Sequence, residues 1–119
     1  MTTTTTITSK ILLVGYNMTG EQRVEKATTL REYGFYVTEK FAQEDILEKL
    51  VFDWLIVLWP LTGGLLPIEH LAYYTKLIEA EKRISFVCST PPINILASIE
   101  VYPRWSNFLT RNFSTINLS

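Results

Sequence analysis

The chain of 119 residues has few of the side chains from which catalytic and metal centres are built. It has one cysteine, Cys88, which excludes an internal disulfide and any zinc site that needs several cysteines. It has one histidine, His70, which excludes a histidine pair for a metal or a relay. The net charge is -1, so the sequence has no excess of positive charge that would attract nucleic acid or an anionic membrane. A cofactor or metal is not expected.

The sequence pattern also predicts no targeting segment and no membrane-spanning segment. The first ten residues, MTTTTTITSK, have neither a basic region nor an apolar one, so we expect no secretory signal there. The apolar stretch over 54–68 is interrupted by prolines and glycines and is too short to cross a bilayer. We therefore expect a cytoplasmic protein with a disordered threonine-rich tail over 1–9 and one domain over 10–119.

What the chain does have is a run of six apolar residues, WLIVLW over 54–59, followed by the turn-forming stretch PLTGG. A short run without alternation is typical of a strand buried on both faces of a parallel sheet. Turns at the carboxyl end of such a strand are where α/β proteins usually bind ligands. Here the turn carries no acid, base or metal ligand.

The remaining pattern alternates strands with helices, which predicts a parallel sheet. Thr19 and Gln22 have the spacing of a capping box, and Gly34 is placed to end the helix that they begin. A further helix is expected to start at Pro67 and to bury Ile68, Leu71, Ala72, Thr75 and Ile78. The predicted strands are 10–14, 35–38, 54–59, 84–88 and 108–111, and two other helices are predicted over 44–50 and from Pro91 to Ile99.

Four of these segments resemble receiver domains of two-component response regulators: KILLV, LREYGFYV, LWPLTGGLL and FLTRNFS. The resemblance implies a three-layer flavodoxin/CheY-like α/β sandwich, with a five-stranded parallel sheet in the order 2-1-3-4-5. A receiver normally ends in an amphipathic helix, which we expect to be missing or truncated here. The surface it would leave bare is expected to be covered by a second copy, as in a dimer, or by another protein.

The receiver's functional positions fall on residues that lack its chemistry. The phosphate-accepting aspartate falls on Leu58, and the acids that hold Mg²⁺ fall on Gly15 and Tyr16, with Asn17 beside them. Phosphoryl transfer needs both a carboxylate and a cation, so the resemblance implies a pseudo-receiver that is not an enzyme. The family's hydroxyl and lysine positions, which complete this degenerate pocket, fall on Cys88 with Ser89, and on Arg111.

Two functions follow from this resemblance. The first is a protein-interaction module that binds a histidine kinase, a response regulator or a transcription factor without a phosphorylation switch. Its expected surface is rich in residue types common at interfaces: Tyr102, Arg104, Trp105 and Phe108. The alternative is a sensor that holds a small molecule between Tyr16, Leu58, Cys88 and Arg111, although apolar side chains at a strand end are more often simple packing.

Overall fold

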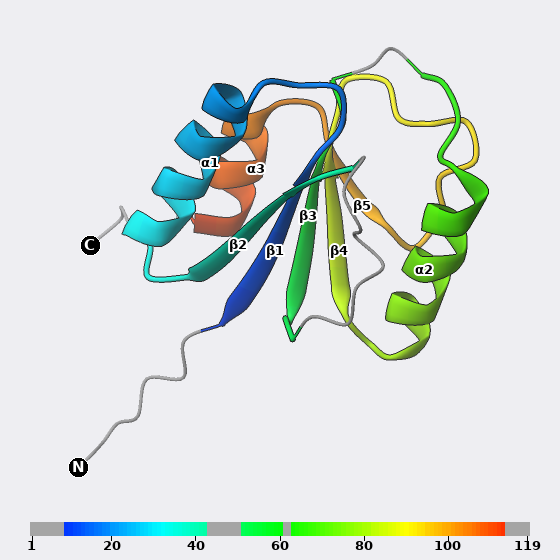
Figure 1. Ribbon diagram of the computed structural model, residues 1–119, viewed down its shortest axis with the longest axis horizontal. Helices are drawn as coiled ribbons and strands as arrows, with labels where there is room; N and C mark the ends of the chain where they lie inside the picture. The colour runs from blue at the N-terminus through cyan, green and yellow to red at the C-terminus, as the bar shows by residue number, and fades with distance from the viewer. Residues whose placement is uncertain (1–8, 43–50, 61–62, 114–119) are drawn as a thin grey trace.

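The computed structural model describes residues 9–42, 51–60 and 63–113. These residues form five parallel strands in the order β2-β1-β3-β4-β5 and three helices, an α/β sandwich with the strand order of the CheY-like fold (Figure 1). The strands are β1 (Lys10–Gly15), β2 (Tyr36–Phe41), β3 (Trp54–Leu58), β4 (Arg83–Val87) and β5 (Glu100–Tyr102). The helices are α1 (Gly20–Glu32), α2 (Ile68–Glu79) and α3 (Trp105–Phe113). The predicted sheet order is confirmed.

The sheet separates two apolar cores because alternate side chains of each strand point to opposite faces. Figure 1 shows α1 and α3 side by side on one face and α2 on the other. The first core contains Leu13, Ile56 and Leu58 of the central strands with Leu30 of α1 and Phe108 of α3. The second contains Leu12, Val57 and Phe86 with Tyr74 of α2. Every residue of β3 is buried, as its uninterrupted apolar run predicts.

The ends of α1 follow the sequence signals closely. The Thr19 side chain accepts a hydrogen bond from the Gln22 backbone, and the Gln22 side chain accepts one from the Thr19 N–H. This capping box satisfies two N–H groups that the helix itself cannot pair. Gly34 follows the helix at φ 98°, in the left-handed region that favours glycine. Both predicted boundary features are confirmed.

The fifth strand was predicted in the wrong place. Residues 108–111 belong to α3, and the strand is instead the three-residue segment Glu100–Tyr102. Phe108 and Phe113 are both buried under α3, and a helix is the conformation that brings these apolar side chains to one face. A helix of nine residues therefore does follow the last strand, so of the two predicted alternatives, a missing or a truncated helix, the first is wrong.

The surface near α1, predicted to be bare, is covered by α3. The Phe113 ring stacks on Tyr33 at a centroid distance of 4.5 Å, and it also contacts Phe35 at 5.7 Å. Because α3 covers this face, it is no longer expected to need a second copy or another protein to cover it.

Two helix predictions were also wrong in detail. Residues 91–99 contain turns but no helix, because the Asn94 side chain bonds both the N–H and the C=O of Leu66 and ties the segment to another loop. The stripe predicted for α2 is rotated: Ile68 is 82% exposed, whereas Tyr74 is fully buried. The predicted helix over 44–50 and residues 1–8 of the tail predicted over 1–9 lie outside the described residues.

Candidate functional site at the carboxyl edge of the sheet

The carboxyl edge of the sheet, where the strands end, brings together several of the predicted site residues. The backbone N–H of Tyr16 bonds the carbonyl of Leu58 at 3.0 Å, and the N–H of Cys88 bonds the carbonyl of Tyr102 at 2.8 Å. Gly15 closes β1, and a side chain there would meet the sulfur of Met18 at 2.7 Å. Of the positions that the resemblance assigns to a phosphate pocket, those at the ends of β1, β3 and β4 therefore do meet at one edge.

Their side chains do not share a pocket. Tyr16 and Cys88 point into the core under α2, whereas Leu58 points into the core under α1 and α3. All three are at most 6% exposed. This geometry gives no support to a ligand held between Tyr16, Leu58 and Cys88, and it favours the interpretation of these residues as packing.

The other predicted residues of this pocket lie at the surface. Asn17 is exposed at φ 50° and lines an open hollow of about 580 Å³ with Met18, Thr19 and Gln22. Ser89 is exposed directly after Cys88. Arg111 belongs to α3 rather than to a strand end, and lines a separate hollow of about 380 Å³ beside β5. Its predicted place at the end of the fifth strand is wrong, because Tyr102 occupies that position.

The space at the end of β1 is filled by a group of hydrogen-bonded rings. The Tyr16 hydroxyl lies 2.5 Å from the Tyr74 hydroxyl and 2.8 Å from Nδ1 of His70, both on α2. The Tyr16 ring packs against Trp59, with centroids 4.8 Å apart. The indole N–H of Trp59 in turn donates to the Gly63 carbonyl. These contacts fasten the first turns of α2 to the end of β1.

Burial keeps the groups of this cluster neutral at physiological pH. It raises the pKa of Tyr16 to about 12, although the hydrogen bond with Tyr74 acts in the opposite direction. It also raises the pKa of Tyr74 and lowers that of His70. Burial raises the pKa of the Cys88 thiol to about 11, so this cysteine lacks the thiolate that a reactive site needs.

The four residues predicted as an interaction surface serve mostly as packing. Phe108 is fully buried, Trp105 stacks on it at a centroid distance of 5.0 Å, and Tyr102 meets it edge-on at 5.3 Å. Arg104 alone of the four is exposed. The prediction of a surface made by all four is therefore wrong, because Phe108 of α3 is buried and the rings of Trp105 and of Tyr102 in β5 pack on it.

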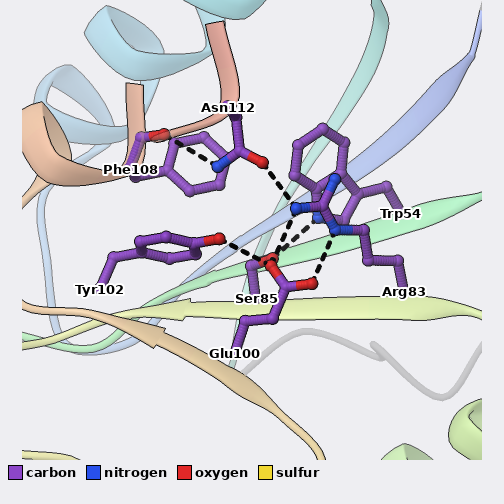
Figure 2. A network of polar contacts seen from close by, with 7 residues as sticks. All are labelled: Trp54, Arg83, Ser85, Glu100, Tyr102, Phe108 and Asn112. Atoms are coloured by element: carbon purple, nitrogen blue, oxygen red, sulfur yellow. Dashed lines mark hydrogen bonds and ion pairs between the residues drawn. The ribbon is translucent and has the colours of Figure 1, made fainter. Parts of the chain in front are cut away.

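A polar network that the sequence did not reveal lies at the opposite, amino-terminal edge of the sheet. Figure 2 shows Glu100 of β5 at its centre: Arg83 binds both carboxylate oxygens at 2.9 Å, and Ser85 and Tyr102 donate to Oε1. Arg83 also bonds Asn112 of α3 at 2.6 Å and lies over the Trp54 ring. Burial opposes ionisation of Glu100, but these hydrogen bonds outweigh it and lower its pKa. The network joins β3, β4, β5 and α3.

Three strongly exposed apolar side chains lie on two loops of the carboxyl edge and on the first residue of α2. Leu65, Ile68 and Ile93 are 66%, 82% and 81% exposed, and we call these three side chains the loop surface. The two loops are held together because Ile93 N–H bonds the Gly64 carbonyl and Asn94 bonds both backbone groups of Leu66. In the sequence, the proline-containing segments GGLLPI and PPIN are the signal that could have indicated the loop surface.

No known protein family, curated protein sequence or solved structure matches the chain. In the part of the chain that the structure describes, no three His, Cys, Asp or Glu residues are grouped so that they could hold a metal ion. No helix in the described ranges is long and apolar enough to cross a bilayer.

Proposed function

We propose that this protein is a receiver-like interaction module that binds a partner protein through the loop surface, without a phosphorylation switch. The observation that carries the proposal is the exposure of Leu65, Ile68 and Ile93 on neighbouring segments at one edge of the sheet. Single exposed aliphatic side chains are common, but three on adjoining segments are typical of a surface that a partner covers. This surface replaces the one expected from the sequence.

The chemistry of the carboxyl edge supports binding rather than phosphoryl transfer. The side chain at the end of β3 is the buried Leu58, which has no oxygen to accept a phosphoryl group. Within the proposal, the partner is a histidine kinase, a response regulator, a transcription factor or a second copy of this chain, and binding takes place in the cytoplasm.

The proposal is tested with a double variant, Leu65→Asp with Ile93→Asp, and the control Val51→Asp. Val51 is 79% exposed and precedes β3, on the opposite edge, so the control adds a charge to a similarly exposed aliphatic position. Wild type and control should retain the same partner from a native lysate, and light scattering should detect it if the partner is a second copy. Once identified, the partner should bind the double variant at least tenfold more weakly. Equal binding by all three proteins would overturn the proposal.

The absence of a phosphorylation switch has a separate test. Incubation with acetyl phosphate and Mg²⁺ should add no phosphoryl group to the protein. The measurement is intact mass, with a receiver that is known to be phosphorylated as the positive control. A stable phosphoryl adduct would refute this part of the proposal while leaving the binding surface standing.

A further inference from the structure

The contacts of Tyr16 with Tyr74 and His70 assign every proton of that cluster. Tyr74 is fully buried, and among the described residues its hydroxyl has one hydrogen-bond partner, the Tyr16 oxygen. A buried hydroxyl proton needs an acceptor, so Tyr74 donates to Tyr16. Tyr16 then donates its own proton to Nδ1 of His70, 2.8 Å away. The chain runs in one direction, from Tyr74 through Tyr16 to a neutral imidazole that carries its proton on Nε2.

The hydrogen bonds of the neutral cluster leave no acceptor for an additional proton. The neutral cluster has two hydroxyl protons and two contacts, one proton for each contact. Protonation of His70 places a third proton on Nδ1, which must donate to Tyr16. One hydroxyl proton then has no acceptor in a largely apolar environment, an unfavourable state. Tyr16 and Tyr74 both keep their hydroxyl protons between pH 5.5 and 7.5, because their pKa values are raised. Neither forms a phenolate that would balance the positive charge of a protonated His70.

The surroundings of His70 determine how strongly it resists protonation. Tyr16 faces it from the end of β1, and Tyr74 and Glu69 face it from its own helix. Cys88 of the same core stays neutral, and Trp59, which packs on Tyr16, does not titrate. Burial lowers the pKa of His70 more than the negative charge of Glu69 raises it, so the balance favours the neutral ring.

We propose that the Tyr74–Tyr16–His70 chain makes the attachment of α2 to the end of β1 depend on a neutral His70, so that acidification loosens the first turn of α2. Ile68 of the loop surface belongs to that same turn. Acidification would therefore weaken partner binding as well. This last consequence rests on the proposed function, whereas the effect on stability does not.

The first experiment compares the free energy of unfolding of the wild type and His70→Asn between pH 7.5 and 5.5. The side-chain oxygen of asparagine takes the place of Nδ1 and accepts from Tyr16 without titrating. Because His70 is the only histidine, it is the one side chain with an ordinary pKa in this window. The pKa of His70 is lower in the folded state than in the unfolded state. The free energy of unfolding is therefore highest above pH 6.5 and decreases as the pH falls toward the pKa of the folded state. The wild type should lose stability on acidification, and the variant should not.

The second experiment follows the His70 ring proton by NMR in the wild type and in Tyr16→Phe. The wild-type ring should titrate below its ordinary pKa of 6.5, and the variant should titrate at a higher pH because the donor to Nδ1 is gone. An unchanged pKa in Tyr16→Phe, or equal pH slopes for the wild type and His70→Asn, would overturn the proposal. If Tyr16→Phe does not fold, the comparison of pH slopes decides alone.

A third measurement separates this proposal from the proposed function. Partner affinity should fall between pH 7.5 and 5.5 for the wild type and stay constant for His70→Asn. A pH-dependent stability without any partner binding would refute the proposed function and leave the hydrogen-bond chain intact. A partner that binds equally at both pH values would refute the regulatory consequence.

Discussion

The two edges of the same sheet use polar side chains in opposite ways. At the amino-terminal edge, Glu100 is ionised and receives hydrogen bonds from three residues, so the network is held by charge. At the carboxyl edge, Tyr16, Tyr74 and His70 are neutral and form one directed chain. Arg83 and Glu100 are 41% and 38% exposed at the side chain, whereas Tyr74 is fully buried. Above pH 5, a charged pair near solvent keeps its charges and its contribution to stability when the pH changes. A buried neutral hydrogen-bond chain that contains a histidine loses stability when the histidine is protonated.

The two edges also differ in role: the charged edge serves stability, and the carboxyl edge serves the proposed function. The charged network fastens the short β5 and α3 to the rest of the sheet, a role completed within the molecule. The neutral hydrogen-bond chain includes His70 in the first turn of α2, the turn to which Ile68 of the loop surface belongs. Loops at the carboxyl edge of a parallel sheet are the usual location of binding sites, and here the edge presents shape and apolar surface in place of reactive groups.

The largest effect is expected from Phe108→Ala, which tests whether α3 closes the core beside the charged network. Phe108 is fully buried and its ring contacts Trp54, Tyr102, Trp105 and Phe113. Removing it should lower the free energy of unfolding by about 3–5 kcal/mol, measured by urea denaturation. Thr110→Ala, at an exposed position of the same helix, is the control and should change little. A small loss for Phe108→Ala would mean that this residue is exposed, as the sequence first suggested.

The next effect tests the direction of the neutral chain. Tyr16→Phe leaves the buried Tyr74 hydroxyl without an acceptor and should lower stability by about 1–3 kcal/mol. Tyr74→Phe removes that hydroxyl together with its proton, while the bond from Tyr16 to His70 remains. It should therefore cost about 1 kcal/mol or less. Equal losses for the two variants, measured by thermal unfolding at pH 7.5, would contradict the assigned direction.

Glu100→Gln tests the charged edge. Solvent screening limits the expected loss to about 1 kcal/mol at pH 7. The hydrogen bonds of Glu100 lower its pKa against the opposing effect of burial, so its contribution is present above the ordinary value of 4.5 and is lost as the pH falls through the folded value. The stability difference between wild type and variant should therefore shrink below pH 4.5. Glu79→Gln, exposed at the end of α2, is the matched control. A difference that persists at pH 3 would mean that the charge is not what matters.

Where sequence patterns succeeded or failed follows from their length and locality. The capping box at Thr19, the glycine after α1 and the four longer strands depend on neighbouring residues, and the structure confirms them. The fifth strand has three residues, too few for a period, and residues 108–111, which belong to α3, were interpreted as that strand. Because that strand was misplaced, the pairing of Arg83 with Glu100 could not be foreseen.

The candidate site depended on contacts between distant parts of the chain. The alignment of strand ends brought Tyr16, Leu58 and Cys88 to one edge as expected, but alternation along the strands sent Leu58 to the opposite face. His70 lies 54 residues from Tyr16, and no local pattern links them. The loop surface was missed because Ile68 falls at helical spacing with Leu71, which favoured a buried position.

The smallest effect on stability is expected at the loop surface itself, and that is what makes it informative. Leu65→Asp and Ile93→Asp each replace a side chain that is at least 66% exposed, so each should change the free energy of unfolding by less than about 0.5 kcal/mol. Ile99→Asp, at a position 6% exposed in the same connection, should be strongly destabilising and serves as the contrast. A large loss of stability for Leu65→Asp or Ile93→Asp would mean that these side chains pack within the molecule. Unchanged stability with weakened partner binding would separate the binding surface from the core that supports it.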